Sequence, residues 1–440
     1  MMGNRYDKYK DSGIAWIGEI PEHWEIIKIK YILKNNSLKV GPFGSQLSGS
    51  DILSKGKYWI YNQRTVLDNN YSSCNSFISN EKYNDLIGFK VSAGDILLTT
   101  RGTIGKISRI PSIFNEGVIH PCIIRFNINE KILKYEILRY IFNDSDIVTN
   151  QVKYNSNSTT IDVIYSDTLK NIVLAYIPQK EQQSIAAYLD QKCGEIDELI
   201  TLQEEMITKL QSYKQSVITE AVTKGLDKNV PLKDSGIEWI GEIPKHWNIC
   251  QLKRCANIIN GYAFNSNHFS KDLGVPVIRI GDIINEMVSF ENIVYVQGNN
   301  ELDKFQVHKN DILIAMSGAT VGKIGIYDIE DKAYVNQRVG IIRTKQYGFI
   351  KRMFATYGFA NYVTLSSAGS AQPNISSDGI LNFYIPLPPI SEQQTIADYL
   401  DQRCSEIDKL ISIKQQKIEK LKEYKKSLIF ECVTGKRKVS

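Results

Sequence analysis

Long apolar runs are missing from this chain of 440 residues. No stretch approaches the roughly 18 consecutive apolar residues of a membrane-spanning helix, so we expect no transmembrane segment. The N-terminal residues, MMGNRYDKYKDSG, also lack the apolar core of a secretory signal. These two absences favour a cytoplasmic protein that does not bind a membrane.

Paired cysteines are missing as well. The seven cysteines are an odd number and include no CxxC pair. This usage predicts reduced, half-buried thiols, among them Cys193 and Cys404, which occupy equivalent positions in two similar segments. The five histidines are scattered and offer no metal-ligand cluster. His23 and His246 each precede a Trp, which favours a structural role over metal binding.

Catalytic motifs are also absent. RGTIGK (101–106) and SGATVGK (317–323) are similar to phosphate-binding loops, but their glycine spacing is too short and no Ser or Thr follows either Lys. We expect strand-ending turns there. No Asn-Pro-Pro-aromatic sequence typical of adenine methyltransferases occurs, and the Glu-x-Lys sequences at 330–332 and 423–425 lack the preceding Pro-Asp of many nucleases. The sequence therefore predicts no catalytic site, no cofactor bound by this chain and no metal.

The chain does contain a long internal duplication. Residues 181–200 and 392–411 are identical at 15 of 20 positions, and residues 9–24 and 232–247 at 13 of 16. The first pair lies 211 residues apart and the second pair 223, so the first copy holds 12 more residues between the two segments. A repeat of this length is a duplicated domain rather than a solenoid unit. The apolar fraction of 42% and charged fraction of 23% are those of a globular protein.

Two long helical patterns begin at the first repeated segment, at roughly 181–222 and 392–433. Apolar residues recur every seven positions over about five heptads, which predicts two helices packed as a coiled coil. The predicted seam consists of Leu189, Ile196, Ile200, Gln203, Ile207, Leu210 and Val217, and of Leu400, Ile407, Ile411, Lys414, Ile418, Leu421 and Leu428. Gln203 and Lys414 occupy the same slot and are expected to fix register at some cost in stability.

The flanking residues predict where these helices end. Ser391 and Gln394 have the spacing of a capping box, whereas Lys180 is a poorer cap for the first helix. Gly225 and Gly435 are expected to stop the two helices. Because a short connection follows the first helix, the second globule should lie at its far end, and the second helix should return antiparallel to the first.

Between the repeated segments the two copies have diverged. Residues 31–176 and 254–386 read as mixed α/β, with short strand-like runs followed by glycine turns. We predict two α/β (α+β) globules separated by two long helices in an antiparallel coiled coil, with pseudo-two-fold symmetry from the tandem duplication. The predicted domains are a first globule (1–177), a first helix (178–225), a second globule (226–388) and a second helix with a basic tail (389–440). Such a chain indicates two recognition domains that bind different targets and are attached to the same kind of helical frame.

The distribution of charge is a weaker indication. The net charge is +5, but the two helical segments are acidic or neutral, so the remaining residues include 42 basic and 32 acidic ones. An excess of this size fits a nucleic-acid-binding surface and an ordinary solvated surface equally well.

The order of the motifs resembles the specificity subunit of Type I restriction–modification enzymes over essentially the whole chain. GPFGSQL (41–47), VIRIGDI (277–283) and NQRVGIIR (336–343) are also similar to target-recognition domains of that family. The resemblance implies a noncatalytic subunit in which each globule reads one half of a bipartite double-stranded DNA target. It implies that the helices set the spacing and dock two adenine-N6 methyltransferase subunits, which can recruit motor–nuclease restriction subunits. S-adenosylmethionine, ATP and Mg would be bound by those partners.

Candidate DNA contacts follow from side-chain chemistry. Base readout needs Arg, Lys, Asn or Gln, and phosphate anchoring uses Lys, Arg, Ser or backbone N–H groups. In the first globule these criteria favour Ser45, Gln46, Asn62, Gln63, Arg64, Arg101, Lys106 and the polar run 154–160, with Tyr154, Asn155 and Asn157. In the second they favour Tyr262, Asn265, Arg279, Ser317, Lys323, Gln337, Arg338, Ser370 and Gln372. For each residue a solvated surface position is the alternative, and the resemblance carries over no base contact.

Two other classes of protein compete with this interpretation. A coiled-coil assembly protein without sequence-specific DNA binding would explain the helices but not two divergent globules. A self-contained DNA methyltransferase or nuclease would need the cofactor and catalytic motifs that the sequence lacks.

Overall fold

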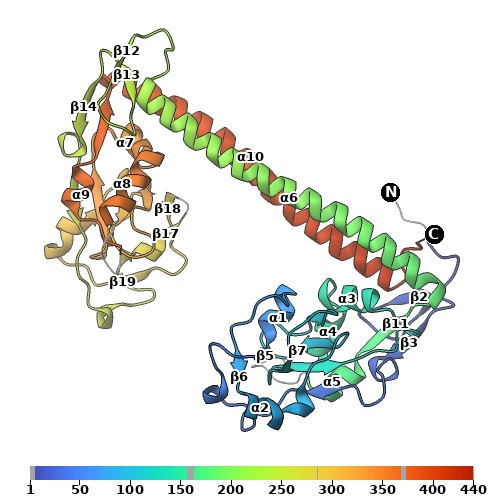
Figure 1. Cartoon of the computed structure of the whole chain (residues 1–440). Helices are drawn as coiled ribbons and strands as arrows, with labels where there is room; N and C mark the ends of the chain where they lie inside the picture. The colour runs from blue at the N-terminus through green and yellow to red at the C-terminus, as the bar shows by residue number, and fades with distance from the viewer. Residues whose placement is uncertain (1–4, 156–162, 285, 368–372, 440) are drawn as a thin grey trace. The chain divides into compact units, whose positions relative to one another are not determined.

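The computed structural model describes residues 5–155, 163–284, 286–367 and 373–439. It divides into two compact units, which we name unit 1 (residues 1–203 and 416–440) and unit 2 (residues 204–415). Two long continuous helices, α6 and α10, contribute to both units (Figure 1). Among the described helices, none combines the length and apolar character that crossing a membrane would need.

The long helices are α6 (Gln179–Lys224) and α10 (Ile390–Val433). Both begin two residues earlier than predicted, so the cap predictions were wrong. Lys180 and Ser391 lie inside the first turns, and the carbonyl oxygens of Pro178 and Pro389 accept the first helical bonds instead, from Glu181 N at 2.8 Å and Gln393 N at 3.0 Å. Pro178 and Pro389 directly precede the two helices and set these starts, because the fixed φ of proline already suits the backbone that enters a helix.

The C-terminal ends were predicted correctly. Gly225 and Gly435 follow the two helices with φ of 74° and 73°, a left-handed conformation that favours glycine. The Gly225 N–H donates back to the Ala221 carbonyl at 3.1 Å, which closes the last turn of α6.

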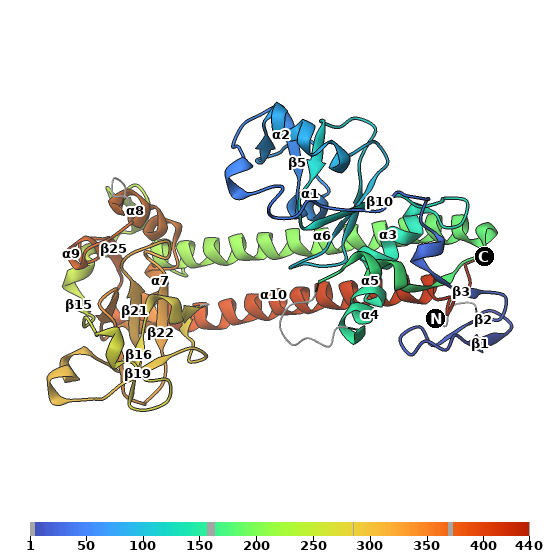
Figure 2. The ribbon, with the colours of Figure 1, turned by 90° about the horizontal axis from the view of Figure 1, so that it is seen from below.

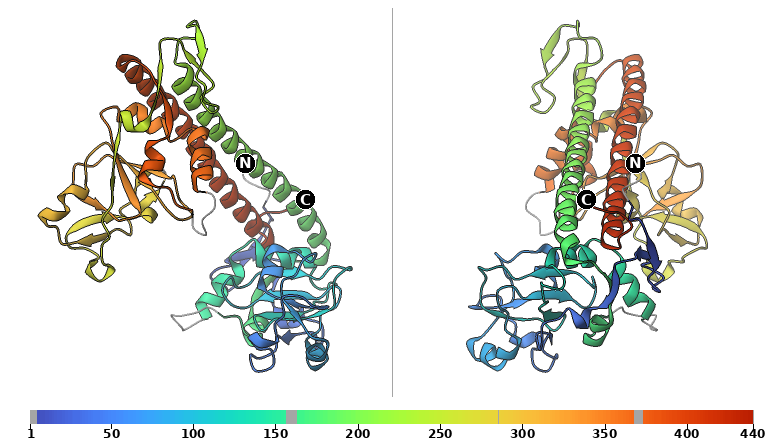
Figure 3. Two further views of the ribbon diagram at one scale, coloured as in Figure 1. Left: turned by 60° about the vertical axis from the view of Figure 1, so that its left-hand side comes forward. Right: turned by 90° about the vertical axis from the view of Figure 1, so that its right-hand side faces the viewer.

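The two helices run antiparallel in each unit. In unit 1 the start of α6 shares a core with the end of α10, and Asp197 pairs with Lys425 at 2.7 Å. In unit 2 the end of α6 shares a core with the start of α10, and Lys214 pairs with Asp408 at 2.8 Å. The ribbons lie side by side in the several views (Figures 1–3). These two ion pairs join the same duplicated positions, so the duplication repeats contacts as well as sequence.

The residues proposed for the seam are all buried or half-buried. Leu189 and Leu400 are fully buried, and Gln203 is only 3% exposed. Lys414, its counterpart in the second helix, is half-buried.

Unit 1 contains a four-stranded antiparallel sheet, a three-stranded sheet and two strand pairs. The four-stranded sheet has the order β4 (Lys39–Val40), β10 (Ile123–Phe126), β7 (Ile96–Thr99) and β8 (Ile107–Arg109). The others are β6 (Phe77–Ile78), β5 (Tyr58–Tyr61) and β9 (Gly117–Ile119), then β11 (Val173–Tyr176) with β3 (Glu25–Lys28), and β1 (Tyr9–Asp11) with β2 (Glu19–Pro21). Its shorter helices are α1 (Gln63–Asp68), α2 (Asn80–Asp85), α3 (Tyr135–Asn143), α4 (Ile147–Asn155) and α5 (Ser166–Asn171).

Unit 2 repeats this plan with an enlarged sheet. The order is β15 (Asn257–Asn260), β24 (Val339–Arg343), β21 (Asp311–Ala315), β22 (Ile324–Tyr327), β18 (Glu286–Val288) and β17 (Ile283–Ile284). The remaining strands are β19 (Val294–Val296), β16 (Val275–Ile278), β23 (Ala333–Val335) and β20 (Gln306–Val307), then β14 (Asn248–Gln251) with β25 (Tyr384–Leu387), and β12 (Leu232–Asp234) with β13 (Glu242–Pro244). Its shorter helices are α7 (Tyr347–Met353), α8 (Tyr357–Ser367) and α9 (Ser377–Leu381).

Two of the strand-like runs predicted from the sequence, at residues 95–100 and 311–316, form β7 and β21. Every residue of both strands is buried, which explains why they read as continuous apolar runs rather than as alternating patterns. Each lies inside its sheet and pairs with the strand that follows a turn, β8 or β22.

The duplicated segments contact each other. In unit 1, His23 Nε2 lies 2.7 Å from a carboxylate oxygen of Glu181, the first residue of the repeated EQQ sequence. In unit 2 the ring nitrogen of His246 lies 2.8 Å from Glu392, and the Trp247 indole N–H donates to the same carboxylate at 2.9 Å. The histidines therefore anchor the helix start, which agrees with the structural role predicted for them.

Candidate nucleic-acid interface

One edge of the large sheet in unit 2 is assembled by backbone hydrogen bonds between distant turns. Gly261 N donates to the Val339 carbonyl at 3.0 Å, and Met316 N donates to the Arg338 carbonyl at 2.9 Å. Ile375 N then donates to the Met316 carbonyl at 2.9 Å. We name this surface the loop edge of unit 2, with Asn260, Ser317, Gln337, Arg338 and residues 373–378.

Unit 1 builds the corresponding edge with the same three bonds. Gly41 N donates to the Ile123 carbonyl at 2.9 Å, Thr100 N to Cys122 at 3.1 Å, and Ile164 N to Thr100 at 3.0 Å. The bonds align the two edges position by position. The loop edge of unit 1 therefore consists of Val40, Arg101, Pro121, Cys122 and residues 164–167.

Glycine is required at the first of these contacts. A Cβ added at Gly41 would lie 2.2 Å from the His120 carbonyl oxygen, and one at Gly261 would lie 2.1 Å from that of Asn336. Both distances are far inside van der Waals contact. The approach of the two turns thus depends on a residue without a side chain.

The two glycine-rich segments are strand-ending turns, as predicted. Gly102 and Gly105 join β7 to β8 with φ of 67° and 76°, and Gly318 and Gly322 join β21 to β22 with φ of 83° and 82°. A phosphate loop leads into a helix, whereas each of these turns leads into an antiparallel strand.

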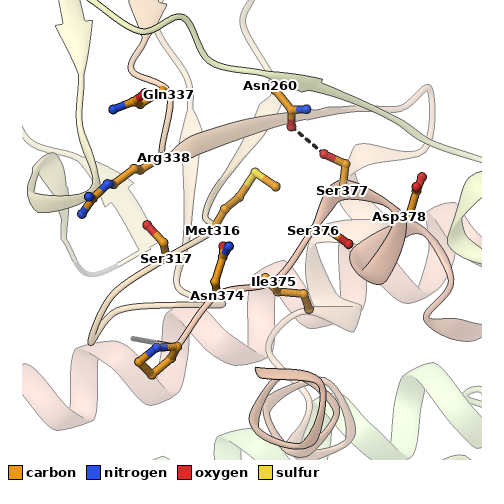
Figure 4. Close-up of a pocket in the computed structure, with 11 residues that line it drawn as sticks. Asn260, Met316, Ser317, Gln337, Arg338, Asn374, Ile375, Ser376, Ser377 and Asp378 are labelled. Atoms are coloured by element: carbon orange, nitrogen blue, oxygen red, sulfur yellow. Dashed lines mark hydrogen bonds between the residues drawn. The ribbon is translucent and has the colours of Figure 1, made fainter. Parts of the chain in front are cut away.

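The loop edge of unit 2 encloses an open hollow of about 810 Å³ (Figure 4). Gln337 and Arg338 project from one side, and the segment Ser376–Asp378 bounds the other. Ser377 donates a hydrogen bond of 2.5 Å to Asn260. The Ser317 hydroxyl oxygen is buried and has no hydrogen-bond partner among the described residues. The hollow therefore offers guanidinium and amide donors together with amide, hydroxyl and carboxylate acceptors.

Several of the same positions in unit 1 carry different side chains, whereas Ser166 and Asp167 match Ser377 and Asp378. Val40 stands where unit 2 has Asn260, and Pro121 and Cys122 stand where it has Gln337 and Arg338. Tyr165, which is 64% exposed, stands in place of Ser376.

Burial also lowers the pKa of His120, the residue before this unit 1 turn. Its Nδ1 accepts a 3.1 Å hydrogen bond from Cys122 N. A neutral imidazole in this position is not a phosphate-binding cation.

Three of the residues proposed in unit 1 are engaged within the protein. Lys106 donates to the Asn143 backbone carbonyl, Asn62 caps α1 by accepting from Thr65 N at 3.2 Å, and Arg64 pairs with Asp68 at 3.2 Å. These contacts hold local structure, although the Arg64 side chain remains 80% exposed.

The other described candidates of unit 1 are exposed or half-buried. Ser45 and Gln46 lie in an exposed turn after β4, and Arg101 is exposed at the end of β7. Gln63 donates weakly to the Thr103 carbonyl at 3.4 Å. Tyr154 is 76% exposed, with its ring 5.4 Å from that of Trp16.

The candidates of unit 2 divide in the same way. Arg279 is tied to Asp282 at 3.0 Å and to the Asn292 carbonyl at 2.6 Å, and Asn265 caps a short turn. Tyr262 packs at 4.9 Å against Phe264, and Lys323 is exposed. The structure gathers the remaining three described candidates, Ser317, Gln337 and Arg338, around one hollow.

Three candidates, Asn157, Ser370 and Gln372, lie outside the described residues, and Asn155 is the last residue of α4. The sequence interpretation missed Asn260, Asn374, Ser376, Ser377 and Asp378 of the hollow. The polar run NISSD (374–378), which leads into the first turn of α9, was the available signal. The sequence interpretation did not include this run, because its proximity to Arg338 depends on strand pairing and cannot be read from distance along the sequence.

The cysteines and acidic residues show no alternative centre. Burial raises the pKa of Cys193 to about 11 and of Cys432 to about 12, so both stay protonated near neutral pH. Within the described ranges, no group of three or more His, Cys, Asp and Glu is placed to hold a metal ion.

Two divergent loop edges on a duplicated helical frame define a class of two-domain recognition protein. The family model for the Type I restriction modification DNA specificity domain matches residues 21–211 and again residues 244–423. The chain belongs to this family.

One relative of known class matches over nearly the whole chain, and another over about half of it. The specificity subunit of the type I restriction enzyme MjaVIII from Methanocaldococcus jannaschii is 27% identical, over 96% of this chain and 94% of that protein. The EcoBI specificity subunit of Escherichia coli is 29% identical over 47% of this chain. A solved structure described as bearing on complex assembly and conformational transition of the type I R-M system aligns with a TM-score of 0.68. It covers 94% of this chain and 98% of its own at 16% identity, and so shares the fold.

Proposed function

We propose that this chain is the DNA-specificity subunit of a type I restriction–modification complex. The observation that carries the proposal is the pair of loop edges. Equivalent backbone hydrogen bonds form both edges, but several of their side chains differ. Two readers of unlike half-sites need this arrangement, whereas a coiled-coil assembly protein does not. Each unit reads one half of a bipartite double-stranded DNA target.

The chain is noncatalytic and acts as the targeting subunit. Adenine-N6 methylation belongs to two methyltransferase subunits, which bind S-adenosylmethionine. Where motor–nuclease restriction subunits join, they bind ATP and Mg. The long helices of this chain set the spacing between the readers and dock the two methyltransferase subunits.

Matched exposed residues on the two helices support docking of two copies of one partner. Three large apolar positions of α6 are about half exposed, and the duplicated positions of α10 are exposed to nearly the same extent. The pairs are Leu199 (44%) with Leu410 (47%), Leu202 (44%) with Ile413 (57%), and Tyr213 (49%) with Tyr424 (51%). Exposed apolar side chains repeated in this way mark a protein-binding surface.

The test is coexpression with the methyltransferase partner, followed by base-resolution mapping of methylated adenines. We expect one bipartite target with two defined halves and an unspecified gap. The purified chain alone should transfer no labelled methyl groups to DNA. Methylation at sites unrelated in sequence, or methyl transfer by the rigorously purified chain, would contradict the proposal.

A further inference from the structure

The hydrogen bonds that align the two loop edges also align their side chains, and these differ in kind. We propose that unit 2 reads a guanine in its half-site through Arg338, whereas unit 1 uses the equivalent position for apolar contact with an A·T pair. This inference rests on the proposed function and adds the chemistry by which each half-site is recognised.

Arg338 is available to bind a ligand. It is exposed, lines the hollow and has no ion-pair partner among the described residues. Two other arginines of unit 2, Arg279 and Arg343, are both held by carboxylates, Arg343 by Asp311 at 2.6 Å. A guanidinium that forks towards O6 and N7 of guanine makes the most frequent specific contact in the major groove.

The other groups in the hollow favour base edges over a phosphate. Asp378 is exposed on the wall opposite Arg338 and would repel a phosphate. A carboxylate instead accepts from the exocyclic amine of cytosine, which pairs with guanine. Gln337, which is exposed, adds an amide that can both donate and accept. This mixture matches the edge of a base pair rather than an all-acceptor anion.

In unit 1 the corresponding turn cannot make the arginine contact, although Asp167 stands at the position of Asp378. Pro121 and Cys122 replace Gln337 and Arg338, so no forked donor projects from this turn. Val40 and Tyr165 are 40% and 64% exposed, and their apolar surfaces suit contact with the thymine methyl group. Arg101 is the cation within this edge, and it stands at the position of Ser317 rather than that of Arg338.

The experiment starts from the bipartite target mapped for the wild-type complex. Exchanging residues 254–386 for another family member's domain identifies the half-site that unit 2 reads. Arg338→Ala removes the guanidinium, and Arg338→Lys keeps the charge without the fork. Lys309→Ala is the matched control, because Lys309 is an exposed cation before the start of β21, at the opposite end of that strand from Ser317.

We expect both Arg338 variants to lose discrimination at one guanine of the unit 2 half-site by about 10- to 100-fold, with the unit 1 half-site unchanged. Lys309→Ala should retain the wild-type target. Replacing that guanine by 7-deazaguanine, which lacks the N7 acceptor, should weaken binding of the wild-type complex. The same replacement should have little effect on binding by the Arg338→Ala complex.

Two results would overturn the inference. If Arg338→Lys behaves as wild type while Arg338→Ala weakens binding to all sequences equally, Arg338 contacts a phosphate. If the unit 2 half-site contains no guanine, or both variants keep its specificity, Arg338 is not its reader. A wild-type complex that modifies no bipartite target at all would instead refute the proposed function.

Discussion

Two arginines and two lysines among the predicted DNA contacts differ in what surrounds them. Arg279 and Lys106 satisfy carboxylates or carbonyls of the protein, and both hold a turn in place. Arg101 and Lys323 lie exposed on equivalent strand-ending turns. Side-chain chemistry alone nominated all of these as DNA contacts, and only their partners separate the two groups.

Gln203 is a buried polar residue in the helix seam, and its Oε1 has no hydrogen-bond partner in the described part of the chain. A buried acceptor without a partner costs about 1–3 kcal/mol. We therefore expect Gln203→Leu to raise the free energy of unfolding by about 1–2 kcal/mol, measured by denaturant titration. The exposed Gln183→Leu is the control and should give no such gain. A destabilised Gln203→Leu variant would mean that this amide is satisfied in the folded chain.

Asp401 joins α10 to α7 by accepting from Arg352 and pairing with Lys351 at 3.1 Å. Burial of the carboxyl raises its pKa, but the bonds from Arg352 and Lys351 outweigh that effect and hold the pKa below its ordinary value. A lowered pKa in the folded state stabilises the protein above the ordinary pKa of about 4, and this stabilisation is lost as pH falls below it.

We expect Asp401→Asn to cost about 1 kcal/mol of unfolding free energy at neutral pH, a value reduced because the carboxylate is half exposed. The difference from wild type should shrink as pH falls below about 4. Thermal unfolding at a series of pH values measures this, with Glu423→Gln, on the exposed surface of α10, as control. A difference that stays constant with pH would rule out the ion pairs as its source.

At the scale of elements, the long helices combine a strong local pattern with repeated cross-links. The heptad spacing selects the buried face, and the Asp197–Lys425 and Lys214–Asp408 pairs occupy equivalent positions beside it. Such exposed pairs contribute little energy singly, about 0.2–1 kcal/mol each. The two ion pairs instead help to match the register of the two helices.

The helix pair is expected to act as the ruler between half-sites. Four residues inserted near Gln203 add about 6 Å to a helix that rises about 1.5 Å per residue. The insertion is slightly more than one turn, so the seam is nearly preserved and the fold should survive as a stutter. Because α10 is not lengthened, part of the extension can be absorbed by bulging of the helix.

Since a base pair occupies about 3.4 Å of DNA, the gap in the target should grow by one or two base pairs while both half-sites keep their sequence. Methylation mapping of the insertion variant with its partner measures the gap directly. An active variant with an unchanged gap would assign the spacing to another element.

For the whole molecule, the separate cores of the two units imply independent reading of two half-sites. Exchanging residues 31–176 for another family member's domain should change one half-site and leave the other unaltered. Methylation mapping of the hybrid reveals both halves together. A change in both halves would show that the readers are coupled.

Affinity for DNA should come from both units and depend steeply on salt. With about six phosphate contacts, the slope of log K against log salt concentration would be near −5. Titration of the complex with target duplex between 50 and 200 mM salt, about the usual range for such measurements, tests this value. A slope near zero would mean that phosphate contacts contribute little.

The loop edge could be predicted only in part. Ser317, Gln337 and Arg338 were predicted from their side-chain chemistry, and the structure places them together around one hollow. The run 374–378 joins them because Ile375 N bonds to the Met316 carbonyl, a pairing across 59 positions that leaves no local signal. The cap predictions were wrong for the opposite reason. The local pattern at Ser391 favours a cap, but the helix begins earlier, in the turn where the Pro389 carbonyl accepts from Gln393 N.

The sequence by itself determined the duplication, the two helices, their apolar seam and their glycine ends, because these depend on periodicity and on single-residue backbone preferences. It also determined that two divergent α/β globules occupy the same frame. Tertiary structure decided which cations remain free, which polar groups surround the hollow and how the two loop edges correspond. Those properties arise from backbone hydrogen bonds between residues far apart in the chain, and such bonds form only when the strands pair.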